Sequence, residues 1–224
     1  MLIAGQPTFM TATTSSPSSQ HVLSLEVRGL NCIRGEKLLF SNLHFSLHAG
    51  QGLHVRGENG AGKTSLLRLL TGLTKPESGE VLFSGISIAQ ASESYRRNVL
   101  FMGHRDALKE DLTALENLEM YAALDGIEFN TATTLASLKR FNLKGREDLP
   151  VSCLSAGQKK RLLMARMTTR KAVVWILDEP FNGLDLVAVK LLQDLLAEQL
   201  QQGGIIILTG HQVLQLPQLQ VLDL

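Results

Sequence analysis

The stretch Gly57–Thr64, with the sequence GENGAGKT, constrains the fold of this chain more than any other feature. It has the form G-x-x-x-x-G-K-[ST] and lies between an apolar segment, 52–56, and a run of helix formers, 65–71. Strand, glycine loop and helix in this order form a phosphate-binding loop, because loop N–H groups and the helix N-terminus converge on phosphate oxygens. Lys63 would reach the β- and γ-phosphates, and Thr64 would offer its hydroxyl to Mg²⁺. The alternative, a glycine-rich turn before an ordinary helix, is disfavoured by both flanks.

A second feature is the apolar run 172–177, which ends in the adjacent carboxylates Asp178 and Glu179. A continuous apolar run is typical of a central parallel strand, and ligands bind at the carboxyl ends of such strands. Asp178 is therefore a candidate Mg²⁺ ligand, and Glu179 a candidate general base for an attacking water. The two acids could instead simply begin a turn. A phosphate loop elsewhere in the chain makes that alternative less favourable, because a nucleotide site needs an acidic partner.

A third feature is the segment 154–158, which opens a helix expected over 156–170. Ser155 is a good N-cap, and Gly157 would let the backbone approach a ligand closely. A helix N-terminus of this kind can bind an anion. Taken alone, the segment is more simply an ordinary capped helix.

Together these motifs resemble the ATP-binding cassette (ABC) family of transporter ATPases, over nearly everything from Leu23 to Leu224. Residues 57–64 are similar to the Walker A motif, and 173–178 to Walker B followed by the catalytic Glu179. Residues 154–158 resemble the family signature, with alanine at 156 where glycine is common. The corresponding later elements are the D-loop, 183–185, and the switch histidine, His211.

The resemblance implies that two cassettes pair head to tail, so that Ser155 and Gly157 contact the γ-phosphate held by the opposite copy. It implies ATP and Mg²⁺ as ligands, with Glu179, His211 and Lys63 as catalytic residues. The residues expected to contact nucleotide are Gly57, Glu58, Asn59, Gly60, Ala61, Gly62, Lys63, Thr64, Ser65, Arg34, Ser155 and Gly157. The expected metal ligands are Thr64, Asp178 and His104.

Two positions depart from the family pattern. Glutamine usually occupies the position of His104, and histidine there could either bind Mg²⁺ or its water when neutral, or mark a lost metal contact. An aromatic residue usually stacks on adenine before Walker A, and alignment by eye puts Arg34 there. A guanidinium can also stack on a base, and an exposed loop arginine is the alternative.

Further segments look like one branch of the family, the ATP-binding subunit of the heme exporter of cytochrome c maturation. These segments are 103–104, 112–118, 154–161, 175–181 and 203–212. The branch implies a peripheral subunit on the cytoplasmic face of the inner membrane, docked on integral membrane subunits near 95–115, where Arg96, Arg97 and Arg105 cluster. No heme is expected on this chain.

Composition bears on the alternatives. No apolar run approaches the roughly 18 residues of a membrane helix, so membrane association would go through partners. A net charge of +1, one Trp and two Tyr disfavour nucleic-acid binding. A cassette for another substrate remains open, since membrane subunits choose the substrate. A soluble cassette ATPase acting on DNA or the ribosome is less favoured, because the chain lacks a coiled-coil insertion or a second cassette.

The predicted fold is an α/β P-loop ATPase of the ABC type, with a mixed core sheet, an antiparallel β subdomain and an inserted helical subdomain. The ATPase domain is expected over 22–224 and the helical subdomain over about 90–165. Residues 1–21 include the low-complexity run TATTSSPSS and are expected to be disordered.

Overall fold

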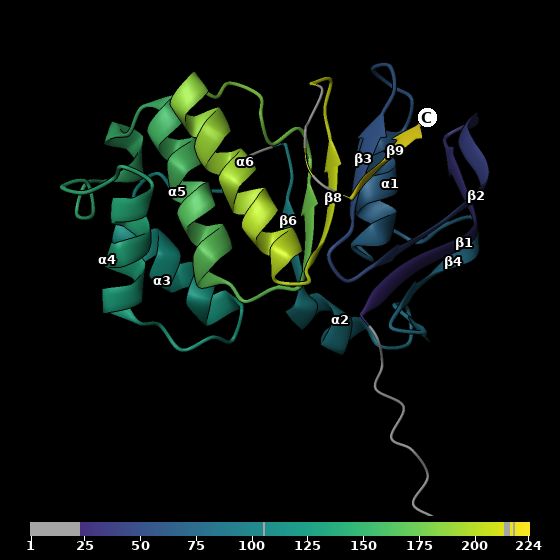
Figure 1. The fold of residues 1–224 in the computed structure, drawn as a ribbon, viewed down its shortest axis with the longest axis horizontal. Coiled ribbons are helices and arrows are strands. Elements are labelled where there is room, and N and C mark those ends of the chain that lie inside the picture. Colours follow the sequence, from purple (N-terminus) through teal and green to yellow (C-terminus); the bar gives the residue numbers. More distant parts are fainter. Residues whose placement is uncertain (1–22, 105, 213–215, 217) are drawn as a thin grey trace, which may run out of the picture.

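Strands pair into two separate sheets in the computed structural model, which describes residues 23–104, 106–212, 216 and 218–224 (Figure 1). The first sheet is antiparallel, with the order β2-β1-β4-β5. Its strands are β1 (Ser24–Arg34), β2 (Lys37–His48), β4 (Ser78–Phe83) and β5 (Ile86–Ser87). The strand β2 is continuous through Asn42, which has a φ of 51°.

The second sheet is parallel and has the order β6-β7-β8-β3-β9. Its strands are β3 (Gly52–Arg56), β6 (Val99–Met102), β7 (Val174–Leu177), β8 (Ile205–Thr209) and β9 (Leu219–Asp223). Every residue of β7 and β8 is buried, as a central parallel strand requires. The expected ABC-type α/β fold and its antiparallel β subdomain are confirmed, but the core sheet, expected to be mixed, has only parallel pairs among its described strands.

Helices cover both faces of the parallel sheet (Figure 1). The helix α1 lies between the two sheets, and α6 lies on the opposite face beside α5, with α3 and α4 farther out. Their bounds are α1 (Lys63–Leu70), α2 (Ser92–Asn98), α3 (Ala114–Leu124), α4 (Thr131–Arg140), α5 (Ala156–Thr169) and α6 (Leu186–Gln201), with a short 3₁₀ turn, η1, at Val151–Cys153. Within the described part of the chain, every helix is too short or too polar to cross a bilayer.

Side-chain caps begin four of these helices. Thr113 at α3 and Ser155 at α5 each form a capping box with the residue three positions on, and Asn130 and Asp185 cap α4 and α6. Each cap satisfies an N–H that the first helical turn cannot pair internally. The helix starts at 113, 155 and 185 are therefore fixed by local sequence.

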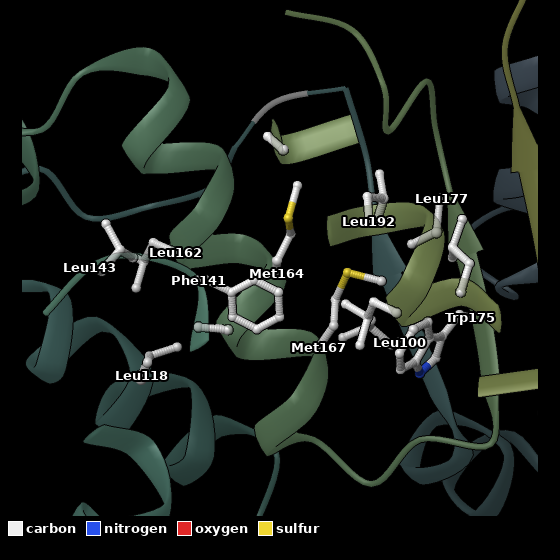
Figure 2. Close-up of a cluster of buried hydrophobic side chains, with 14 of the residues drawn as sticks. Leu100, Leu118, Phe141, Leu143, Leu162, Met164, Met167, Trp175, Leu177 and Leu192 are labelled. Carbon is white, nitrogen blue, oxygen red and sulfur yellow. The ribbon is translucent and has the colours of Figure 1, made fainter. Parts of the chain in front are cut away.

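The buried side chains form two clusters, one on each face of the parallel sheet. One cluster joins α1, the antiparallel sheet and one face of the parallel strands. The other joins α3, α4, α5 and α6 to the second face, and Figure 2 shows Met167 of α5 beside Trp175 of β7 within it. The outer helices therefore have no core separate from the sheet.

Two predictions about boundaries stay predictions. The proposed ATPase domain, 22–224, contains both sheets, and residues 1–21 lie outside the described residues. The proposed helical range, about 90–165, contains α2, α3, α4 and most of α5, but also β6, which pairs with β7 in the parallel sheet.

Candidate functional site

The glycine loop joins β3 to α1 and has the backbone that the motif predicts. Gly57 has a φ of 146° and Gly62 a φ of 110°, both in the region that favours glycine. A Cβ on Gly57 would lie 2.7 Å from the Leu224 carbonyl oxygen, and one on Gly62 would lie 3.1 Å from the Leu39 Cβ. The loop is thus held between the end of β9 and the strand β2, where a larger residue does not fit.

The N-terminus of α1 differs from those of α3 to α6. Its N-cap is Gly62, which supplies no side-chain cap, whereas side chains cap α3 to α6. As in any helix, the first N–H groups of α1 have no intrahelical partner, and no side-chain cap among the described residues pairs them. Around them, Glu58, Asn59 and Gly60 are exposed, while Ala61 and Ser65 are half-buried. This arrangement suits an anion such as a phosphate.

Lys63 is buried, with 6% of its surface exposed, and its ammonium turns back over the loop. The Nζ donates to the Gly57 carbonyl at 2.7 Å and to the Glu58 carbonyl at 3.0 Å. The positive charge is therefore held at the mouth of the loop, next to the free N–H groups of α1.

Asp178 connects the glycine loop to the end of β7. The Thr64 hydroxyl donates to Asp178 Oδ2 at 2.9 Å, although the two residues are 114 positions apart. The other carboxylate oxygen, Oδ1, accepts from the Thr209 hydroxyl at 2.8 Å. Because Asp178 is only 6% exposed, both hydrogen bonds stabilise a carboxylate that has lost most of its water.

Glu179 follows directly and has an unusual backbone, with a φ of 51°. Its N–H donates to the Thr209 hydroxyl at 2.8 Å, and its Oε2 accepts from the Asn182 amide at 2.5 Å. His104 lies nearby, with its Nδ1 4.0 Å from Glu179 Oε2. A left-handed backbone in a non-glycine residue costs free energy, so the surrounding contacts must hold Glu179 in place.

His211 lies just beyond β8 and is exposed. It lines one small cavity together with Glu179, Asn182, His54 and Gly210. The structure therefore brings the expected switch histidine to the expected general base, at the carboxyl edge of the parallel sheet.

Three predicted nucleotide contacts lie apart from this edge. Ser155 and Gly157 begin α5, where Ser155 is exposed and a Cβ on Gly157 would meet no atom within 4 Å. Arg34 is exposed at the end of β1, where it pairs with Lys37 of β2. Among the described residues, no hydrogen bond joins any of these three to the glycine loop.

The residues present fit a magnesium ion only in part. Within the described residues, no three His, Cys, Asp or Glu side chains gather as a metal cage. Mg²⁺ bound with a nucleotide needs fewer protein ligands, since phosphates and waters complete its octahedron. The Thr64 hydroxyl and the Asp178 carboxylate, already in contact, have the required chemistry.

The sequence interpretation missed three residues of this edge: Thr209, Asn182 and His54. Thr209 is fully buried and binds both Asp178 and Glu179. The available signals were a threonine directly after the apolar run 205–208 and a histidine inside an otherwise apolar strand. Neither residue type predicts which group the side chain binds, because the groups concerned are far away in the sequence.

Comparisons with known proteins agree with this geometry. A family model described as "ABC transporter" matches residues 40–182. The "Cytochrome c biogenesis ATP-binding export protein CcmA" of Escherichia coli O157:H7 is 48% identical over 197 residues, which cover 88% of this chain and 93% of the relative.

Two solved structures are similar in fold. A putative ABC transporter ATP-binding protein from Pyrococcus furiosus has a TM-score of 0.77 at 22% identity, covering 88% of this chain and 96% of its own. The ATP-binding cassette MJ0796, a dimer in a post-hydrolysis state bound to ADP and Pi, has a TM-score of 0.73 at 22% identity. That match covers 84% of this chain and 88% of the other. Both likenesses support the fold alone.

Proposed function

Because the chain belongs to the ABC transporter family of ATP-binding subunits, we propose that it hydrolyses ATP to power a membrane complex that exports or handles heme for c-type cytochrome biogenesis. The observation that carries the ATPase part is the contact between Thr64 and Asp178, which joins the phosphate loop to the acidic end of β7. The heme part rests on the 48% identity to a cytochrome c biogenesis export protein.

The glycine loop binds the phosphates of ATP through the free N–H groups of α1 and through Lys63. To reach a phosphate, the Lys63 ammonium exchanges its two loop carbonyls for phosphate oxygens. When bound, Mg²⁺ supplies charge neutralisation on the β- and γ-phosphates, and Thr64, Asp178 and His104 are the proposed groups that hold it.

Hydrolysis depends on where Glu179 and His211 lie. Glu179 accepts a proton from the attacking water and keeps that water in line with the γ-phosphate. Its carboxylate is oriented by the Asn182 amide, and its backbone by Thr209. His211, which lines the same cavity, orients Glu179 and stabilises charge on the departing phosphate.

A second copy of the chain completes the site. Ser155 is exposed and Gly157 is half-buried in one copy, and the free space around Gly157 leaves its backbone open to a ligand from outside. In the head-to-tail dimer, these two residues bind the γ-phosphate that the glycine loop of the other copy holds. Arg34, exposed at the end of β1, stacks on the base.

Integral membrane subunits dock on the helical subdomain near 95–115, where Arg96 and Arg97 of α2 lie. A concave surface there is lined by Arg96, Arg97, Asp125, Arg170 and the exposed Leu124. Arg105 lies outside the described residues. The chain is thereby a peripheral subunit on the cytoplasmic face of the inner membrane, attached through its partners.

Glu179→Gln tests the ATPase assignment, because it removes the base and keeps the shape of the side chain. We expect the variant to lose steady-state ATP hydrolysis and to accumulate an ATP-bound dimer. Glu198→Gln is the matched control: Glu198 is in α6 and forms an ion pair with Arg140 instead. Unchanged hydrolysis in Glu179→Gln would refute the assignment of the base.

The heme assignment needs a cellular test. In cells that depend on this chain, Glu179→Gln should abolish assembled c-type cytochromes and leave b-type cytochromes at their normal level. A tagged copy should co-purify with polytopic membrane proteins. Normal c-type cytochromes in the variant would favour a cassette for another substrate, and co-purification with nucleic acid or ribosomes would favour a soluble cassette ATPase.

A further inference from the structure

His54 is a buried histidine that the proposed hydrolysis has not used. It lies in β3, with 3% of its surface exposed, between Leu53 and Val55, which both belong to the cluster under α1. Side chains alternate along a strand, so His54 lies on the opposite face, beside Leu208 of β8. A polar ring at such a position costs free energy unless it finds a partner.

The partner is the carbonyl group just before His211. His54 Nε2 lies 3.0 Å from the Gly210 oxygen, and because a carbonyl only accepts, Nε2 carries the proton. A Cβ on Gly210 would lie 3.7 Å from this nitrogen, in van der Waals contact with the ring. Burial lowers the pKa of His54, so the ring is neutral at neutral pH and keeps a single tautomer.

This hydrogen bond links the strand before the glycine loop to the segment after β8. His54, Gly210, His211 and Glu179 all line the same small cavity. The ring of His54 therefore holds the backbone next to His211, whose side chain lines the same cavity as Glu179.

We propose that His54 is a positioning residue for ATP hydrolysis, which acts through Gly210 to hold His211 in place toward Glu179. This inference rests on the proposed function, in which Glu179 and His211 take part in hydrolysis. The inference adds His54 of β3 to the residues on which hydrolysis depends, and His54 lies on the face of the sheet away from Thr64 and Asp178.

Two amide variants of the purified full chain test the inference. Gln carries an N–H donor on a longer side chain that approaches the reach of Nε2, whereas the shorter Asn stops before it. We expect His54→Asn to lower kcat by about 10- to 100-fold, because a misplaced group in a catalytic site has an effect of this size. His54→Gln should retain most of the wild-type kcat. The KM for ATP should stay within about twofold, because the glycine loop is unchanged.

A double-mutant cycle separates positioning from loss of structure. In a His211→Ala background, His54→Asn should cause no further fall in kcat, because the residue that it positions is gone. Thr134→Val is the matched control, since it removes a buried hydroxyl in α4 that donates to the Asn130 carbonyl and should leave kcat unchanged.

The outcomes distinguish the inference from the proposed function. If Glu179→Gln abolishes turnover but His54→Asn and His54→Gln have equal kcat, only the inference is overturned. The inference is also overturned if His54→Asn lowers kcat by the same factor with and without His211, or if His211→Ala has normal kcat. If Glu179→Gln retains turnover, the proposed function itself fails.

Discussion

Thr209→Val removes the single hydroxyl that joins Asp178 to the backbone of Glu179. The side chain is fully buried, and valine has nearly the same shape, so the change isolates the loss of two hydrogen bonds. The bond to the carboxylate, at 2.8 Å, contributes about 1.5–3 kcal/mol, and the Glu179 N–H left without a partner costs about 1–3 kcal/mol more. The full sum does not apply, because Thr64 still donates to Asp178 and Glu179 is only half-buried. The free energy of unfolding should therefore fall by about 3 kcal/mol.

This loss should lower the melting temperature by about 6–12 °C for a domain of this size. The assay is thermal unfolding of the nucleotide-free protein, followed by steady-state ATP hydrolysis. We expect kcat to fall by about 100-fold, because both carboxylates lose their orientation. Thr209→Ser keeps the hydroxyl and loses one methyl group, so it should cost only about 1 kcal/mol. If Thr209→Val is as stable and as active as Thr209→Ser, the reasoning about this hydroxyl is wrong.

Three further predictions concern other residues of the site. His104→Gln should keep part of the Mg²⁺-dependent ATPase activity, because a glutamine amide can also bind a metal or its water; a complete loss would show that His104 has a role glutamine cannot take. Burial lowers the pKa of His54 below its usual 6.5, so the unfolded chain takes up a proton first as the pH falls. The free energy of unfolding, measured by urea titration, should therefore be highest above about pH 7 and decrease below pH 6.5. The variant His54→Gln should lack this decrease, and an identical pH profile in both proteins would contradict the assignment to His54. Ser155→Ala should lower stability by about 1 kcal/mol by breaking the capping box, whereas Ser155→Asn should keep the cap but reduce ATP hydrolysis; equal unfolding midpoints for the two variants would argue against the cap.

Features set by neighbours in the sequence could be predicted. The glycine loop, the buried strands β7 and β8 and the capped starts of α3 and α5 depend on local glycines, apolar runs and hydroxyl caps. In each case the physical cause lies within about ten residues, so a pattern can show it. The order of the motifs then gave the family, which the comparisons confirm.

Features set by distant contacts could not be predicted. The edge strand β9 is mostly exposed and has no continuous apolar run, so nothing local distinguishes it from a loop. The helix α2 is short and polar, with only Tyr95 buried. Thr209 and Asn182 acquire their roles only when β8 lies beside β7 and the turn after Glu179 closes.

The register of two strands explains how the site arises from these distant parts. Leu177 of β7 pairs with Leu208 of β8, and both point into the cluster under α6. Alternation then directs the next residues, Asp178 and Thr209, to the α1 face, where Thr64 meets Asp178. A shift of one residue in either strand would place the apolar side chain of that strand against the glycine-loop helix and its polar one in the apolar cluster. The need to bury Leu177 and Leu208 therefore also fixes the position of the proposed metal ligand.

Because of the same alternation, the contacts that hold Glu179 and those that hold the His211 segment lie on opposite faces of the sheet. On the α1 face, Thr64, Asp178 and Thr209 form one hydrogen-bonded chain that ends at the Glu179 N–H. On the α6 face, His54 holds Gly210 and hence the start of the His211 segment. The two chains of contacts meet where Thr209 is followed by Gly210, and both reach the cavity that Glu179 and His211 line. Because Glu179 depends on one face and His211 on the other, the relative position of the general base and the switch histidine is determined by the sheet itself, in particular by the pairing of β3, β8 and β7.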